Sequence, residues 1–165
     1  MKKELLGIDK INAVLNKFLE PFEAYADLGE EFSYWYADSR IEYNLVVIEA
    51  STDYFMQNFN RMAPDLNCDP FLASFLHELG HHETLDFIDD DYKPIKAQLE
   101  EDLKRVSEST KAIVHQKYFD LPVEYEATMW AIEYMRNNAQ KVAEFWKELQ
   151  EAIMEFYRLN EVEVA

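Results

Sequence analysis

The 165-residue chain contains one cysteine, three glycines and five prolines. A single cysteine, Cys68, excludes a framework of internal disulfides and is typical of a reducing compartment, so we expect a cytoplasmic location. So few glycines and prolines leave little room for flexible linkers, and no internal repeat or low-complexity tract is visible. We therefore expect one domain that spans residues 1–165.

Long apolar runs and positive charge are also scarce. No stretch approaches the roughly 20 apolar residues that a membrane helix needs, and the N-terminal segment MKKELLGIDKINAVL lacks the continuous apolar region of a signal peptide. The 33 acidic residues outnumber the 16 basic ones, which gives a net charge of −17. A field of that sign repels phosphate backbones and anionic lipids, so we expect neither nucleic acid nor a membrane as a direct partner.

Hydrophobic residues, in contrast, make up 48% of the chain and aromatic residues 15%, as in a folded globular protein. The runs FSYWY and IEYNLVVI flank a short polar turn at 37–40 and predict a β-hairpin. Residues 51–67 are ambiguous between a short helix and a loop. The apolar periodicity predicts helices over residues 8–26, 69–86, 93–117, 123–137 and 139–159. The expected fold is therefore a mainly helical α+β domain with a small antiparallel sheet.

The helix predicted from Asp69-Pro70 onward contains the motif His77-Glu78-Leu79-Gly80-His81. Residues four apart lie on the same helix face, so the two imidazoles can aim at one tetrahedral zinc ion (Zn²⁺). Glu78 can reach a water at the open position of the metal without binding the metal itself. Gly80 is an unusual choice inside a helix and indicates that another backbone passes close to the metal face.

Catalytic zinc usually has three protein ligands, so the two histidines leave one ligand to be found. The candidates are His82, His115 or an acidic residue. His82 points about 100° away from its neighbour on the same helix, whereas His115 stays open. Glu124 is the better candidate, because it falls in the first turn of a predicted helix whose face continues through the small residues Thr128 and Ala131.

These residues carry a family resemblance. The His-Glu-x-x-His motif followed by Glu124-x-x-Ala127-Thr128 resembles the gluzincin metallopeptidases, in which a Glu-x-x-Ala-Asn/Asp pattern on a later helix supplies the third ligand. The small size and the order of elements resemble the minimal gluzincins, such as the ImmA/IrrE-type proteases and related proteins of phages and mobile elements. The resemblance covers roughly residues 30–135.

The resemblance implies a zincin-like domain in which His77, His81 and Glu124 hold zinc and Glu78 is the general base. It implies a zinc metallopeptidase that hydrolyses a peptide bond of a specific protein partner. An edge of the sheet would then hold the substrate in an extended conformation. Thr128 departs from the family, which usually has aspartate or asparagine there as the partner of a metal histidine.

Two questions stay open in the sequence. The residue that stabilises the oxyanion could be His82, His115, Tyr118 or Tyr125. The rival to a protease is a non-catalytic zinc-binding regulatory protein or phage accessory interaction protein, in which a fourth protein ligand such as His115 would close the site. The acidic residues at 89–91 are interpreted as a solvated loop after the metal helix.

Overall fold

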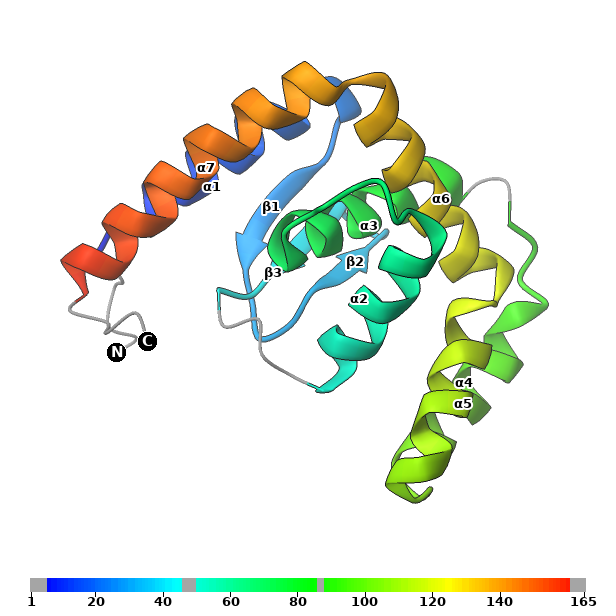
Figure 1. Ribbon diagram of the computed structural model, residues 1–165. Coiled ribbons are helices and arrows are strands. Elements are labelled where there is room, and N and C mark those ends of the chain that lie inside the picture. Colours follow the sequence, from blue (N-terminus) through cyan, green and yellow to red (C-terminus); the bar gives the residue numbers. More distant parts are fainter. Residues whose placement is uncertain (1–5, 46–49, 86–87, 161–165) are drawn as a thin grey trace.

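The computed structural model describes residues 6–45, 50–85 and 88–160. Over these residues the chain forms seven α-helices and a three-stranded sheet (Figure 1), which confirms the predicted mainly helical α+β class. The elements are α1 (Ile8–Leu19), the 3-10 turn η1 (Glu20–Phe22), β1 (Tyr25–Leu28), β2 (Ser33–Trp35), β3 (Arg40–Tyr43), α2 (Ala50–Met62), α3 (Pro70–Thr84), α4 (Tyr92–Leu103), α5 (Glu108–Phe119), α6 (Pro122–Asn137) and α7 (Ala139–Leu159). Among the described helices, none is long and apolar enough to cross a membrane.

The predicted hairpin is confirmed by β2 and β3, which pair antiparallel with Tyr34 opposite Ile41. The sheet as a whole is mixed, however, and not purely antiparallel as expected. β1 adds to the other side of β3 in parallel, with Ala26 opposite Ile41, so the strand order is β1-β3-β2. As a result, β2 lies at an edge of the sheet, and β3 is the central strand.

β1 occupies the end of a segment that was predicted as helix up to residue 26. The helix α1 ends at Leu19, and Pro21 follows in η1, where it has no N–H group to continue the helical hydrogen bonds. Glu23 then takes a left-handed backbone conformation with φ of 56°, which turns the chain away from the helix axis. The side chain of Asn16 accepts a 2.7 Å hydrogen bond from the backbone N–H of Ala26 and so fixes β1 beside α1.

The segment 51–67, left open between a short helix and a loop, contains most of α2 and is therefore mainly helical. One helix prediction needs correction, because the single helix expected over 93–117 is divided into α4 and α5. The two lie side by side as a hairpin that extends away from the sheet (Figure 1). The hairpin folds because its apolar residues pack against one another and against the start of α6 in a second, small core. That core consists of Tyr92, Leu99, Val114, Leu121 and Val123. The predicted end of the metal helix near Asp86 lies outside the described residues.

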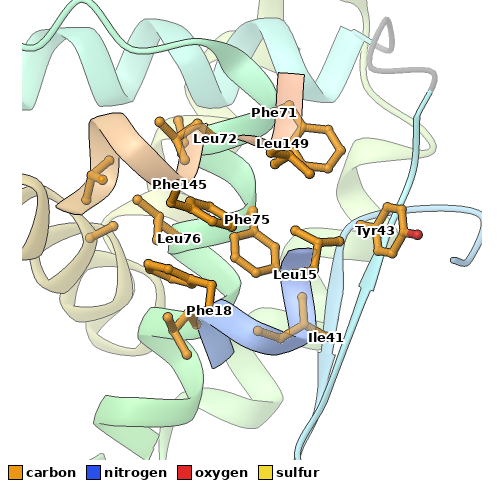
Figure 2. Close-up of a cluster of buried hydrophobic side chains, with 14 of the residues drawn as sticks. Leu15, Phe18, Ile41, Tyr43, Phe71, Leu72, Phe75, Leu76, Phe145 and Leu149 are labelled. Atoms are coloured by element: carbon orange, nitrogen blue, oxygen red, sulfur yellow. The ribbon is translucent and has the colours of Figure 1, made fainter. Parts of the chain in front are cut away.

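Most residues of α3 are buried, because the helix runs through the centre of the main core. Phe75 of α3 faces Phe18 of α1 and Phe145 of α7 (Figure 2), and the last two rings stack with centroids 4.0 Å apart. From the sheet, Ile41 and Tyr43 of β3 fill the same core. Burial of each such side chain contributes on the order of 1.5–3 kcal/mol. Packing against the core thus fixes one face of α3, and this determines that the opposite face of the helix is directed toward α6.

On that opposite face α6 approaches α3 closely. A Cβ atom built at Gly80 would lie 2.3 Å from the carbonyl oxygen of Ala127, which is far inside van der Waals contact. The obstacle is the backbone of α6 and not a flexible side chain, so no rotamer change could relieve it. The prediction that Gly80 admits a neighbouring backbone is confirmed.

We therefore expect Gly80→Ala to separate α3 from α6 and to lower the free energy of unfolding by about 1–3 kcal/mol, as overpacking does in other cores. Urea denaturation followed by circular dichroism measures the change.

Gly29→Ala is the matched control. A Cβ at Gly29 would also be crowded, at 2.6 Å from Oε2 of Glu42, but the carboxylate end of that side chain can rotate away, and the remaining contact, with Cβ of Glu42 at 3.1 Å, needs a shift of only a few tenths of an ångström. Its expected effect is within about 0.5 kcal/mol. Equal stability of the two variants would show that the close approach of α3 and α6 does not constrain residue 80.

Candidate metal centre

The helix α3 begins as its sequence predicts. The carboxylate of Asp69 accepts a 2.8 Å hydrogen bond from the backbone N–H of Phe71, and Pro70 occupies the first helical position. From this start the helical period brings His77 and His81 to the same face, where their ring centroids lie 4.6 Å apart. Both side chains are buried, with 5% and 9% of their surface exposed.

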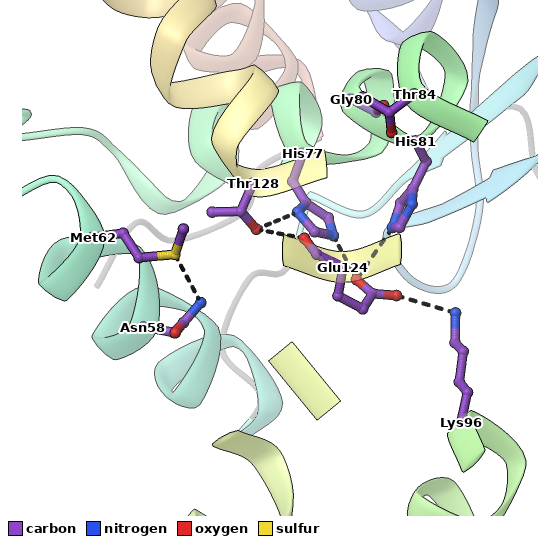
Figure 3. Close-up of polar contacts among 9 residues, drawn as sticks. All are labelled: Asn58, Met62, His77, Gly80, His81, Thr84, Lys96, Glu124 and Thr128. Atoms are coloured by element: carbon purple, nitrogen blue, oxygen red, sulfur yellow. Dashed lines mark hydrogen bonds and ion pairs between the residues drawn. The ribbon is translucent and has the colours of Figure 1, made fainter. Parts of the chain in front are cut away.

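Glu124 reaches this pair from the first turn of α6. Its Oε2 atom lies 2.9 Å from Nε2 of His77 and 3.2 Å from Nε2 of His81 (Figure 3). Ligands bound tetrahedrally to zinc at 2.0–2.1 Å lie about 3.3 Å from one another. Both distances from Oε2 are therefore close to the spacing that a single zinc ion requires between two of its protein ligands.

Thr128 determines which nitrogen of His77 carries the proton. Its hydroxyl donates to the backbone carbonyl of Glu124 at 3.1 Å and lies 2.9 Å from Nδ1 of His77. Because the one hydroxyl proton is used on the carbonyl, the hydroxyl accepts from Nδ1–H. Nε2 is then the ring atom that faces Oε2 of Glu124. With a proton on Nε2 the ring donates to the carboxylate. Without that proton, Nε2 and Oε2 both present lone pairs, as the ligand atoms of a divalent metal do.

Glu124 is held in its charged form despite its burial. Burial alone would raise the pKa of Glu124, but the charge of His81 and the hydrogen bonds with His77 and His81 outweigh it and hold the pKa well below the usual range. The second carboxylate oxygen, Oε1, accepts a 3.1 Å hydrogen bond from Nζ of Lys96. The carboxylate is therefore ready to bind a metal without first losing a proton.

Glu78 provides a second carboxylate beside the same histidines. One atom each from Glu78, His77 and His81 lie within 4.8 Å of one another. Desolvation raises the pKa of Glu78 to about 7, although the nearby charge of His77 opposes this. Glu124 is the carboxylate in hydrogen-bond contact with both imidazoles, which leaves Glu78 beside them as a group able to exchange protons near neutral pH.

These residues lie in a cavity of about 440 Å³ that opens to the surface. Its walls include Phe32, Ser33 and Tyr34 on and beside the edge strand β2, and the rim carries Glu31 and Glu100. Lys96 of α4 and Tyr118 of α5 close the opposite side, with the lysine nitrogen 5.4 Å from the centroid of the tyrosine ring. His77, His81 and Glu124, here called the ligand cluster, line this cavity, so a ligand inside it can reach them.

His82 does not belong to the ligand cluster. Its Nε2–H donates to the backbone carbonyl of Phe22 at 2.7 Å, and its Nδ1 lies 2.7 Å from the hydroxyl of Tyr34. With one ring nitrogen protonated for the carbonyl, the other accepts from the tyrosine. His82 therefore connects α3 to η1 and β2.

The structure also distinguishes among His115, Tyr125 and Tyr118, the other candidates for the residue that stabilises the oxyanion. His115 stacks on Tyr54 with ring centroids 4.2 Å apart and lines a neighbouring cavity of about 340 Å³. Tyr125 is 43% exposed and is not among the residues that line the cavity of the ligand cluster. Tyr118 does line it, and burial together with the charge of Glu124 raises the pKa of the Tyr118 hydroxyl. Of the four oxyanion candidates, the structure brings only Tyr118 to the ligand cluster.

Lys96 is the residue at this site that the sequence analysis missed. It lies three residues before Leu99, so it shares a helix face with a residue of the small core, and that spacing marks it as facing inward. Burial would lower the pKa of Lys96, but Glu124 outweighs this and raises it. Nothing in the sequence indicated which of the many acidic residues it would contact.

Comparison with models of known protein families, with curated protein sequences and with solved structures finds no match to this chain. The resemblance to the gluzincins therefore stays a prediction.

We expect the wild-type chain to retain one zinc ion after dialysis from zinc-containing buffer, as measured by inductively coupled plasma mass spectrometry. His81→Ala and Glu124→Ala should lose that zinc, because each removes one of three converging ligand atoms. His115→Ala is the control and should retain it. Absence of stoichiometric zinc from the wild type, or its loss from His115→Ala and not from Glu124→Ala, would contradict the assignment.

The contact between Thr128 and His77 makes a second prediction. Thr128→Val keeps the shape of the side chain but removes the hydroxyl that orients the imidazole, so zinc affinity should fall about 10–100-fold. Competition with a chromophoric chelator measures the affinity, and Thr128→Ser, which keeps the hydroxyl, should be close to wild type. Equal affinities for the valine and serine variants would show that the hydroxyl does not orient His77.

Proposed function

We propose that this chain is a zinc-dependent metallopeptidase that hydrolyses a peptide bond of a protein partner. The proposal rests on one observation. The ligand cluster offers three ligand atoms in the lining of an open cavity, and a second carboxylate, Glu78, lies beside them. Structural zinc sites are usually closed by four protein ligands, whereas catalytic sites keep one position for water or substrate.

Bound to His77, His81 and Glu124, zinc would supply a Lewis acid that polarises the substrate carbonyl and lowers the pKa of water. Glu78 would take a proton from the attacking water and give it to the departing amine.

The remaining walls of the cavity support roles in binding the substrate. β2 is an edge strand beside the ligand cluster, so an extended peptide can lie along it. Tyr118 keeps its proton because its pKa is raised. Its hydroxyl hydrogen-bonds with Glu124 in this structure and would turn from Glu124 to donate to the oxyanion. Glu31 and Glu100 at the rim, together with the net charge of −17, favour peptides that carry basic side chains.

We further propose a cytoplasmic location, on the strength of the single cysteine. The competing function, a non-catalytic zinc-binding regulatory protein, would use the same three ligands but would not need Glu78. Replacement of Glu78 therefore separates the two functions.

Glu78→Gln should keep its zinc but lower peptide hydrolysis at least about 10²–10⁴-fold, the usual contribution of a general base. Zinc-loaded protein is incubated with a peptide library prepared from a proteome digest, and new termini are identified by mass spectrometry. Glu83→Gln, the same change on the same helix at a residue that does not line the cavity, is the control and should cleave as the wild type does. Cleavage products that are the same for wild type and Glu78→Gln would rule out the proposed mechanism.

A further inference from the structure

Lys96 reaches the ligand cluster from α4, an element that carries none of the three ligands. Its Nζ atom lies 3.1 Å from Oε1 of Glu124, and its side chain is only 29% exposed. The ring of Tyr118 lies beside the ammonium group, with its centroid 5.4 Å from Nζ. The ammonium group is thus held in place by contacts with both α5 and α6.

The two oxygens of Glu124 consequently have different partners. Oε2 faces the Nε2 atoms of both histidines, whereas Oε1 faces the ammonium group of Lys96 (Figure 3). A carboxylate can bind a divalent metal through one oxygen or through both. An oxygen that accepts a charge-assisted hydrogen bond from a half-buried lysine is not free to turn toward a metal on the other side of the carboxylate.

We propose that Lys96 is a positioning residue, which occupies Oε1 of Glu124 and so restricts Glu124 to binding metal through Oε2 alone. The inference depends on the proposed metal site and adds to it. With a single oxygen from Glu124, the three protein ligands leave a position at the metal for water or substrate. A lysine in its charged form has only donors to offer, so it orients the ligand without competing as a ligand itself.

The consequence of losing Lys96 follows from charge as well as from geometry. Removal of the ammonium group frees Oε1 to bind the metal beside Oε2, which raises the coordination number. It also removes a positive charge close to the site of a divalent cation, and that repulsion weakens metal binding in the wild type. Loss of Lys96 should therefore change the coordination of the metal without weakening its binding, whereas damage to the fold would weaken binding.

The test uses Co²⁺ as the probe, bound to the full chain in place of zinc. Four-coordinate Co²⁺ absorbs visible light far more strongly than five- or six-coordinate Co²⁺, so the spectrum reports coordination number independently of activity. Wild type should show the intense absorption. Lys96→Met, which keeps most of the side-chain volume, should bind Co²⁺ at least as tightly and lose most of that absorption. Lys96→Arg, which restores a charged donor to Oε1, should recover it.

Lys93→Met is the matched control, because Lys93 lies one turn earlier on the same helix, pairs with Asp90 and is not among the residues that line the cavity. Its spectrum should equal that of the wild type. A wild-type spectrum and affinity in Lys96→Met would overturn the role of Lys96 but leave the metal site intact. Weaker Co²⁺ binding in Lys96→Met that Lys96→Arg does not restore would also overturn it. Failure of the wild type itself to bind Co²⁺ would overturn the proposed function.

Discussion

The contact of one carboxylate oxygen with two imidazole nitrogens is the interaction around which this fold is arranged. A charged Glu124 that is only 3% exposed would be costly to bury alone, since an isolated buried charge loses its hydration without compensation. Here His77 and His81 lie against one oxygen and Lys96 against the other. The burial of the ligand cluster is thus compatible with a stable protein because every member has a partner of complementary character.

The contact between Glu124 and the two histidines also requires that the backbones of α3 and α6 lie close together. Glu124 reaches the histidines of α3 only because the backbones of α3 and α6 lie very close together at Gly80. A side chain at residue 80 would collide with the carbonyl oxygen of Ala127. The face that α3 turns to α6 is fixed in turn by the core, in which Phe75 lies between α1 and α7. Packing on one side of the helix therefore determines the geometry of the ligand cluster on the other side.

The sequence was sufficient for the parts of this arrangement that depend on local periodicity. The helical period placed His77 and His81 on one face, the pair Asp69-Pro70 located the start of their helix, and Gly80 indicated a close backbone neighbour. Long-range pairing was not predictable in the same way. β1 was missed because it follows the first helix after a turn at Glu23, pairs in parallel with the non-adjacent strand β3, and has only Ala26 buried among its four residues. Lys96 was missed because its contact with Glu124 spans 28 residues and depends on how the hairpin of α4 and α5 folds back.

The central claim is that His77, His81 and Glu124 hold one zinc ion and leave a position open for water or substrate. The most direct measurement is a crystal structure of the zinc-loaded protein with anomalous diffraction data collected at the zinc absorption edge. We predict a single anomalous peak within about 2.0–2.2 Å of Nε2 of each histidine and Oε2 of Glu124, with a non-protein atom at the fourth position. A peak elsewhere, no peak in zinc-replete crystals, or a fourth ligand from the protein would contradict it.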